Sequence, residues 1–173
     1  HTDTGVLTEV YVDSDAGEIT IAIINTYLAI ATADYNAKTD KVAFQVYSYN
    51  NADKIHALDT SKVSTMVVKG EDLAIENVKD GDIVLVNIAG NAIEIMNAPE
   101  VVSETKLSAF SKGSKVVADG TTYAYAASAQ YKTGVLDQYD DQNLAEATYN
   151  LYLDAYDNLI GIELVEDANT YVF

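Results

Sequence analysis

His56 is the only histidine away from the N-terminus, so any catalytic triad in this chain would have to use it. The acids and hydroxyls that a Ser-His-Asp hydrolase needs lie near it in sequence, as Asp53, Asp59, Ser61 and Ser64. Such triads are assembled by tertiary structure, and sequence neighbours rarely form them. The chain also lacks the G-x-S-x-G motif, which exposes a nucleophilic serine in α/β-hydrolases. We therefore interpret His56 as a loop histidine without a catalytic role.

Two groups of acids have the residue types that calcium prefers. They are Asp13, Asp15 and Glu18 in one group and Asp137, Asp140 and Asp141 in the other. Neither group has the spacing of the twelve-residue EF-hand loop. A zinc site needs three or four His, Cys or carboxylate ligands, and the chain has no Cys. We interpret both groups as Asp-rich turns and expect no metal site.

A pair of carboxylates could serve a glycoside hydrolase. The chain has 27 Asp and Glu residues, and the sequence marks no two of them as a catalytic pair. It also has no Trp, which often lines sugar-binding clefts. Neither G-x-x-x-x-G-K-[ST] nor G-x-G-x-x-G occurs, so nucleotide cofactors are not indicated. We expect no enzyme activity and no cofactor, with a carboxylate-based glycoside hydrolase as a remote alternative.

Tyrosine is unusually abundant, with 13 copies. Tyr47 and Tyr49 share one face of an expected strand, and Tyr123 and Tyr125 share one face of another. Exposed tyrosine faces can stack on sugar rings or anchor a protein partner. Tyrosine also favours half-buried pleated surfaces for purely structural reasons. These four residues are the candidates for a glycan- or host-protein-binding role.

The charge of the chain excludes several classes of partner. The chain has 27 acidic and 10 basic residues, all of the basic ones are Lys, and the formal net charge is -17. Such a chain repels phosphate backbones and anionic membrane surfaces, so we expect no nucleic-acid partner. No apolar run reaches the ~20 residues that span a bilayer, so we expect no membrane insertion. The N-terminus is not a signal peptide, and we expect the segment to begin inside a longer exported chain.

The alternation of apolar residues predicts a mainly β fold of antiparallel hairpins that form barrel-like or sandwich subdomains, with little helix. Strand patterns recur every 8–12 residues or so, with Gly, Asn and Asp turns between them. Asp119-Gly120 is a strong two-residue hairpin signal. We expect a barrel-like subdomain at residues 5–100 and a smaller subdomain with a C-terminal hairpin at 101–173. Residues 127–147 are ambiguous, with one helical turn possible near Leu144.

One phrase occurs twice. Residues 11–21 match residues 152–162 in register: an aromatic, an aliphatic and an Asp precede a turn that closes on Gly or Asn. Ile then recurs at alternate positions, as Ile19 and Ile21 or as Ile160 and Ile162. The phrase is either a true repeat or a shared hairpin chemistry, because Gly, Asn and Asp suit such turns for physical reasons.

Four runs carry a resemblance to a known family, at residues 5–13, 78–86, 106–123 and 150–163. They resemble hairpin phrases in large surface proteins of Gram-positive bacteria that carry S-layer homology domains. The helical S-layer homology domain itself is not in this chain, so neither wall anchoring nor any catalytic residue is carried over. The resemblance implies a secreted protein of the cell surface, in the cell wall or S-layer.

These observations lead to one expected function. We expect a non-catalytic extracellular structural or spacer module of a bacterial cell-surface protein. Its expected partners are other surface-protein domains, cell-wall polymer, glycan or host protein. The alternative is a glycan- or host-protein-binding module that uses its tyrosine faces.

Overall fold

The computed structural model describes residues 5–47, 66–111, 114–131 and 147–166. The described chain is mainly β, as the sequence predicts, with one short 3-10 turn at Gly70–Asp72. Within these ranges no helix has the length and apolar character needed to cross a bilayer. Tyr49, His56, Leu144 and the group of Asp137, Asp140 and Asp141 lie outside the described residues.

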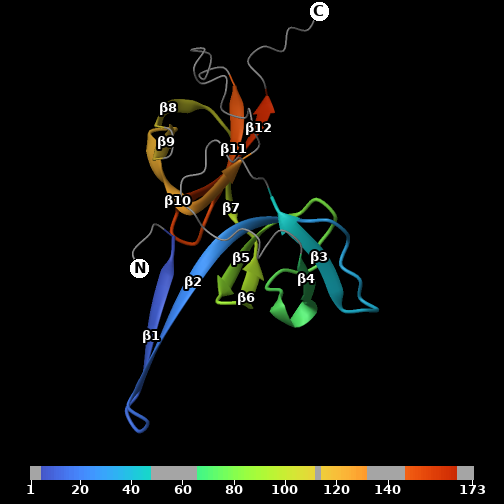
Figure 1. The fold of residues 1–173 in the computed structure, drawn as a ribbon. Coiled ribbons are helices and arrows are strands. Elements are labelled where there is room, and N and C mark those ends of the chain that lie inside the picture. The colour runs from blue at the N-terminus through green and yellow to red at the C-terminus, as the bar shows by residue number, and fades with distance from the viewer. Residues whose placement is uncertain (1–4, 48–65, 112–113, 132–146, 167–173) are drawn as a thin grey trace, which may run out of the picture. The chain divides into compact units, whose positions relative to one another are not determined.

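Most strands pair antiparallel with the next strand in the chain (Figure 1). They are β1 (Leu7–Asp13), β2 (Glu18–Ala31), β3 (Lys41–Val46), β4 (Met66–Lys69), β5 (Ile83–Ala89), β6 (Ala92–Asn97), β7 (Glu100–Thr105), β8 (Leu107–Ser111), β9 (Lys115–Ala118), β10 (Thr121–Tyr131), β11 (Thr148–Leu153) and β12 (Leu159–Glu166).

The chain divides into two compact units. The first consists of residues 1–46 and 59–98, and the second of residues 47–58 and 99–173. The chain therefore passes between the units after Val46, after Leu58 and after Ala98, and the subdomain boundaries expected from the sequence stay a prediction. Tyr47, which directly follows β3, belongs to the second unit.

The first unit is one antiparallel sheet with the order β4-β3-β2-β5-β6. β1 pairs with the first half of β2 alone, and Ile24 is opposite both Leu7 and Ala89. β1 and β5 therefore lie along opposite edges of β2. Figure 1 shows β1 and the first half of β2 as a long ribbon that extends beyond the other strands of this sheet. The second half of β2 is the centre of the core, where Tyr27, Leu28 and Ala29 are fully buried.

The second unit is a six-stranded sheet with the order β7-β11-β12-β10-β9-β8. β10 and β12 run parallel, whereas the sequence predicted antiparallel hairpins throughout. The reason is that the β11–β12 hairpin places its second strand beside β10, and parallel pairing requires a long connection rather than a tight turn. Such long-range pairing leaves no mark in the local pattern.

The Asp119-Gly120 turn is confirmed in its details. Ala118 and Thr121 pair directly, so the loop has two residues. Both have positive φ angles, 47° for Asp119 and 76° for Gly120. That combination defines the type I′ turn, whose twist matches that of the flanking strands. The turn brings β9 and β10 together so that Val116 and Tyr125 enter one core.

Candidate functional site

The structure buries two of the four tyrosines that the sequence nominated for binding. Tyr47 is 9% exposed and Tyr125 is 4% exposed. Tyr123 is partly buried and packs against the core of the second unit, and Tyr49 lies outside the described residues. The expectation of flat, solvent-facing rings is therefore wrong for Tyr47 and Tyr125, because Tyr125 packs in the core of the second unit and the ring of Tyr47 packs against that of Tyr152. Whether the four residues bind a ligand stays a prediction.

Tyr47 is part of a polar group within the second unit. Its ring lies 5.8 Å from the ring of Tyr152, at an interplanar angle of 56°. The Tyr152 hydroxyl donates to Glu163 Oε2 at 2.8 Å, and Asn150 Nδ2 donates to the same oxygen at 3.3 Å. Asn150 Oδ1 in turn accepts from the backbone N–H of Glu104 on β7 at 2.9 Å. The group therefore joins three neighbouring strands and orients one carboxylate.

Burial sets the protonation of these phenols. It raises the pKa of Tyr47 to about 12, and the negative charge of Glu163 adds to the shift. Burial also raises the pKa of Tyr152, together with the hydrogen bond to Glu163. Both hydroxyls therefore stay neutral at ordinary pH, and neither phenol is activated as a base or nucleophile. The Tyr47 hydroxyl is buried without a hydrogen-bond partner among the described residues.

An alkaline destabilisation follows from the raised pKa of Tyr47. A tyrosine whose folded pKa is raised stabilises the fold fully below its unfolded pKa of about 10. We expect the free energy of unfolding to fall by about 2 kcal/mol between pH 10 and pH 12. Urea unfolding followed by far-ultraviolet circular dichroism at several pH values measures this loss.

Tyr47→Phe is the matched control, because it keeps the ring and removes the hydroxyl that titrates. We expect this variant to lose less stability above pH 10 and to be no less stable than the parent at pH 7, since the hydroxyl has no described partner. An identical alkaline loss in parent and variant would contradict the assignment.

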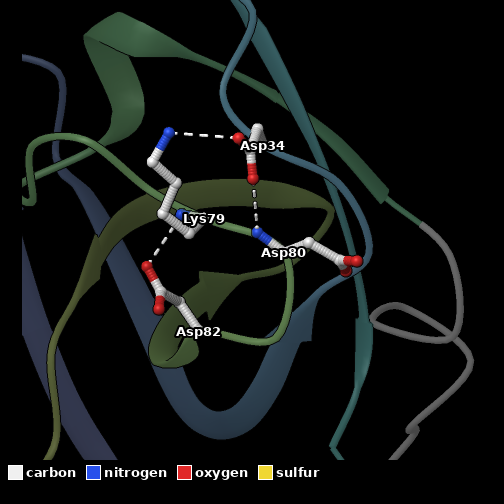
Figure 2. A network of polar contacts seen from close by, with 4 residues as sticks. All are labelled: Asp34, Lys79, Asp80 and Asp82. Atoms are coloured by element: carbon white, nitrogen blue, oxygen red, sulfur yellow. Dashed lines mark hydrogen bonds and ion pairs between the residues drawn. The ribbon is translucent and has the colours of Figure 1, made fainter.

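A second polar network lies in the first unit, where the loop after β2 meets the turn before β5 (Figure 2). Asp34 accepts hydrogen bonds from the backbone N–H of Asp80 at 2.9 Å and from Lys79 Nζ at 3.0 Å. Asp82 accepts from the backbone N–H of Lys79 at 2.8 Å. The hydrogen bond from Asp80, followed by that from Lys79, lowers the pKa of the Asp34 carboxyl. These side chains are exposed, so the network holds the two loops together without creating a buried charge.

A cavity of about 320 Å³ lies nearby in the same unit. It is lined by Tyr35, Gly70, Leu73, Ile75, Glu76, Asn77 and Val78. This volume is at the lower end of the range for small-molecule sites. The Tyr35 hydroxyl donates to Asp40 Oδ1, and this bond raises the pKa of the tyrosine. The tyrosine is therefore a neutral donor already engaged by Asp40, not a catalytic base.

Gly70 lines this cavity and lies against the side chains of Asp40 and Tyr35. A Cβ at this position would collide with the carboxylate of Asp40 and lie 3.0 Å from the Tyr35 hydroxyl. The Gly70 backbone also donates to the Asp40 carbonyl at 3.3 Å. A side chain at position 70 therefore requires the carboxylate of Asp40 and the hydroxyl of Tyr35 to shift.

We expect Gly70→Ala to lower the free energy of unfolding by about 1–3 kcal/mol, the usual cost of overpacking. Urea unfolding of the two proteins measures the difference. Asp40→Gly removes the obstructing carboxylate, and glycine suits the positive φ of 54° at position 40. The double variant should lose less stability than the sum of the two single losses. Additive losses would show that the collision is not the cause.

The acids considered for calcium do not gather into a metal site where they are described. Asp13 Oδ1 accepts from the backbone N–H groups of Asp15 and Ala16, each at 3.0 Å, so this carboxylate caps its own turn. In the described ranges no three His, Cys, Asp or Glu side chains are placed to hold a metal ion.

Sequence reasoning missed the two networks for different reasons. Lys79 and Asp80 lie next to each other in one turn, but their partner Asp34 is 45 residues away from Lys79. Glu163 lies in the C-terminal hairpin that the sequence predicts. Its position opposite Asn150 in the strand register is the only feature that could have indicated this contact. No local pattern indicates that a loop acid will meet a distant turn.

Comparison of the chain with protein-family models, with curated proteins and with solved structures found no match in any of the three. The similarity to surface proteins with S-layer homology domains therefore stays a prediction from the sequence.

Proposed function

We propose that this chain is a non-catalytic structural or spacer module of a secreted protein on the surface of a Gram-positive bacterium. One observation carries the proposal: the best-connected carboxylates of both units hold the fold together. Asp34 ties a loop to a turn, Asp154 closes the β11–β12 hairpin, and Glu163 links two side chains of β11. Acids used in this way contribute rigidity rather than chemistry.

The surface location is supported by composition. The chain has no Cys and a net charge of -17, which keeps an exposed module soluble and disfavours anionic partners. The hairpin phrases quoted above add the similarity to Gram-positive surface proteins. In the organism that makes this chain, antibodies against the segment should label intact cells. Labelling only after lysis would overturn the extracellular part of the proposal.

The spacer role is tested by binding and turnover together. The purified segment is applied to cell-wall polymers, soluble glycans and host extracellular proteins, with and without calcium, and to a set of chromogenic glycosides. We expect no saturable binding, no turnover and resistance of both units to trypsin. Saturable binding to a glycan or host protein would replace the spacer role with a binding role. Turnover that a single Asp or Glu substitution abolishes would establish a hydrolase instead.

A further inference from the structure

The ribbon formed by β1 and the first half of β2 exposes a row of aliphatic side chains. The register places Val10 opposite Ile21 and Val12 opposite Ile19, with Ile23 two residues further along the same face. Residues opposite each other in a ladder share a face, and alternate residues do as well. We call these five residues, Val10, Val12, Ile19, Ile21 and Ile23, the ribbon face. Their exposed fractions range from 40% to 69%.

The ribbon face is as large as the largest apolar patch on a typical monomer. Five aliphatic side chains with these exposures present roughly 500 Å² of contiguous apolar surface, and the largest patch on a monomer is often functional. The second unit contains the matching hairpin with its aliphatic side chains buried. In the matching β11–β12 hairpin the aligned residues Leu151, Leu153, Ile160 and Ile162 are all 0–1% exposed. The same hairpin chemistry is thus covered in the second unit and uncovered on the ribbon.

The charges of the ribbon indicate what can cover it. The four charged residues between positions 5 and 31 are all acids, namely Glu9, Asp13, Asp15 and Glu18. Glu9, Asp13 and Glu18 lie at register positions of the opposite face, and Asp15 is in the turn. A basic partner would be drawn to that opposite face. The uncharged ribbon face is suited to an equally uncharged aliphatic surface.

We propose that two copies of this chain associate face to face through their ribbon faces, about a two-fold axis. Such an interface is self-complementary, and the two ribbons would stack about 10 Å apart as sheets do in a sandwich. With the ribbons antiparallel, each acidic turn lies about 20 Å from its counterpart, beyond the screening length of about 8 Å in physiological salt. All four acids of each copy remain in solvent.

The interface has a predictable strength. About 500 Å² of apolar surface per copy is less than the roughly 800 Å² of a standard stable interface. The dimer is therefore weak and concentration-dependent, with a dissociation constant in the micromolar range. Because each copy carries a net charge of -17, added salt strengthens it. This inference does not depend on the proposed spacer role.

Sedimentation velocity at protein concentrations from about 1 to 200 µM tests the proposal. We expect the average mass to rise from the 18.7 kDa of one chain towards twice that value, and to rise further at higher salt. Ile21→Lys should weaken association at least tenfold, whereas Thr20→Lys should leave it intact. The two substitutions add the same charge to adjacent residues, and Thr20 faces the other way, opposite Tyr11.

Cross-linking gives a second readout, which traps the dimer covalently. The chain has no Cys, and Ile21 is at the centre of the ribbon face, close to the proposed axis. With the ribbons about 10 Å apart, two facing Cys residues are too distant for a direct disulfide, so a bis-maleimide linker of about that length should join Ile21→Cys chains into a dimer and should not join Thr20→Cys chains. A chain that stays monomeric at the highest concentration and in high salt would overturn the proposal.

Equal effects of the substitutions at positions 20 and 21 would also overturn it, because association would then use another surface. So would a large loss of monomer stability in Ile21→Lys, since the face would then be covered by its own chain. Circular dichroism and urea unfolding of each variant at low concentration distinguish these outcomes.

Discussion

Ile162→Ala is expected to lower the free energy of unfolding of the second unit by about 2–5 kcal/mol, the range for removing a buried aliphatic side chain. Ile162 is fully buried on β12 and packs in the cluster that joins β11 to β8 and β9. It lies opposite Leu151, which is also fully buried. Truncation leaves a cavity between two sheet segments whose backbones are held by ladder hydrogen bonds and cannot collapse freely.

Val165→Ala is the matched control on the same strand, because Val165 is 44% exposed. We expect this variant to stay within about 0.5 kcal/mol of the parent. The chain has no Trp, so urea unfolding is followed by circular dichroism and by tyrosine fluorescence. Two transitions are expected if the units unfold separately, and only one of them should move. A similar loss in both variants would contradict the burial that defines this core.

Asp154→Ala is expected to cost about 2–4 kcal/mol, because it leaves three donors around a buried carboxylate without their acceptor. Asp154 is 4% exposed, and its Oδ1 accepts from the backbone N–H groups of Tyr156 and Asn158, both at 2.9 Å. Its Oδ2 accepts from Asn158 Nδ2 at 3.1 Å. One carboxylate thus closes the β11–β12 hairpin, and its loss also removes a charge-assisted interaction.

Asp13→Ala is the natural comparison, because Asp13 occupies the same position in the matching phrase and caps its turn in the same way. Its turn is exposed, so water replaces the lost acceptor and the expected loss is clearly smaller. Asp154→Asn should recover part of the stability, since one oxygen still accepts from the backbone. The urea midpoints of the three variants rank their losses of stability. If Asp13→Ala lost as much stability as Asp154→Ala, burial of the carboxylate would not explain the effect.

These two hairpins separate what a local pattern predicts from what it leaves open. In both, an aromatic, an aliphatic and an Asp precede the turn, and in both the Asp carboxylate accepts backbone N–H groups within the turn. The residue that closes the phrase differs, with Gly17 at φ 68° in one and Asn158 in the other. Hairpin, turn chemistry and strand alternation were all predictable because they involve neighbouring residues.

The burial of these hairpins was not predictable in the same way. Val12 and Leu153 are aligned in the phrase, yet one is 69% exposed and the other 1%. The difference arises because β11 and β12 are flanked by β7 and β10, whereas the first half of β2 pairs with β1 alone in the described chain. The burial of Tyr125 was not predictable either. Its place in the alternating strand pattern suits a surface residue, but the ring of Phe110 packs against its ring.

By itself the sequence determined the mainly β class, the hairpins, the Asp119-Gly120 turn and the acidic, cysteine-free character of the chain. Each of these depends on composition or on residues a few positions apart, which act through backbone sterics and alternation. Only the tertiary structure decided the parallel pairing of β10 with β12, the partners of Asp34 and Glu163, and which aliphatic faces are buried. Those features join residues far apart in the chain, and their energies come from desolvation and packing that no short window contains.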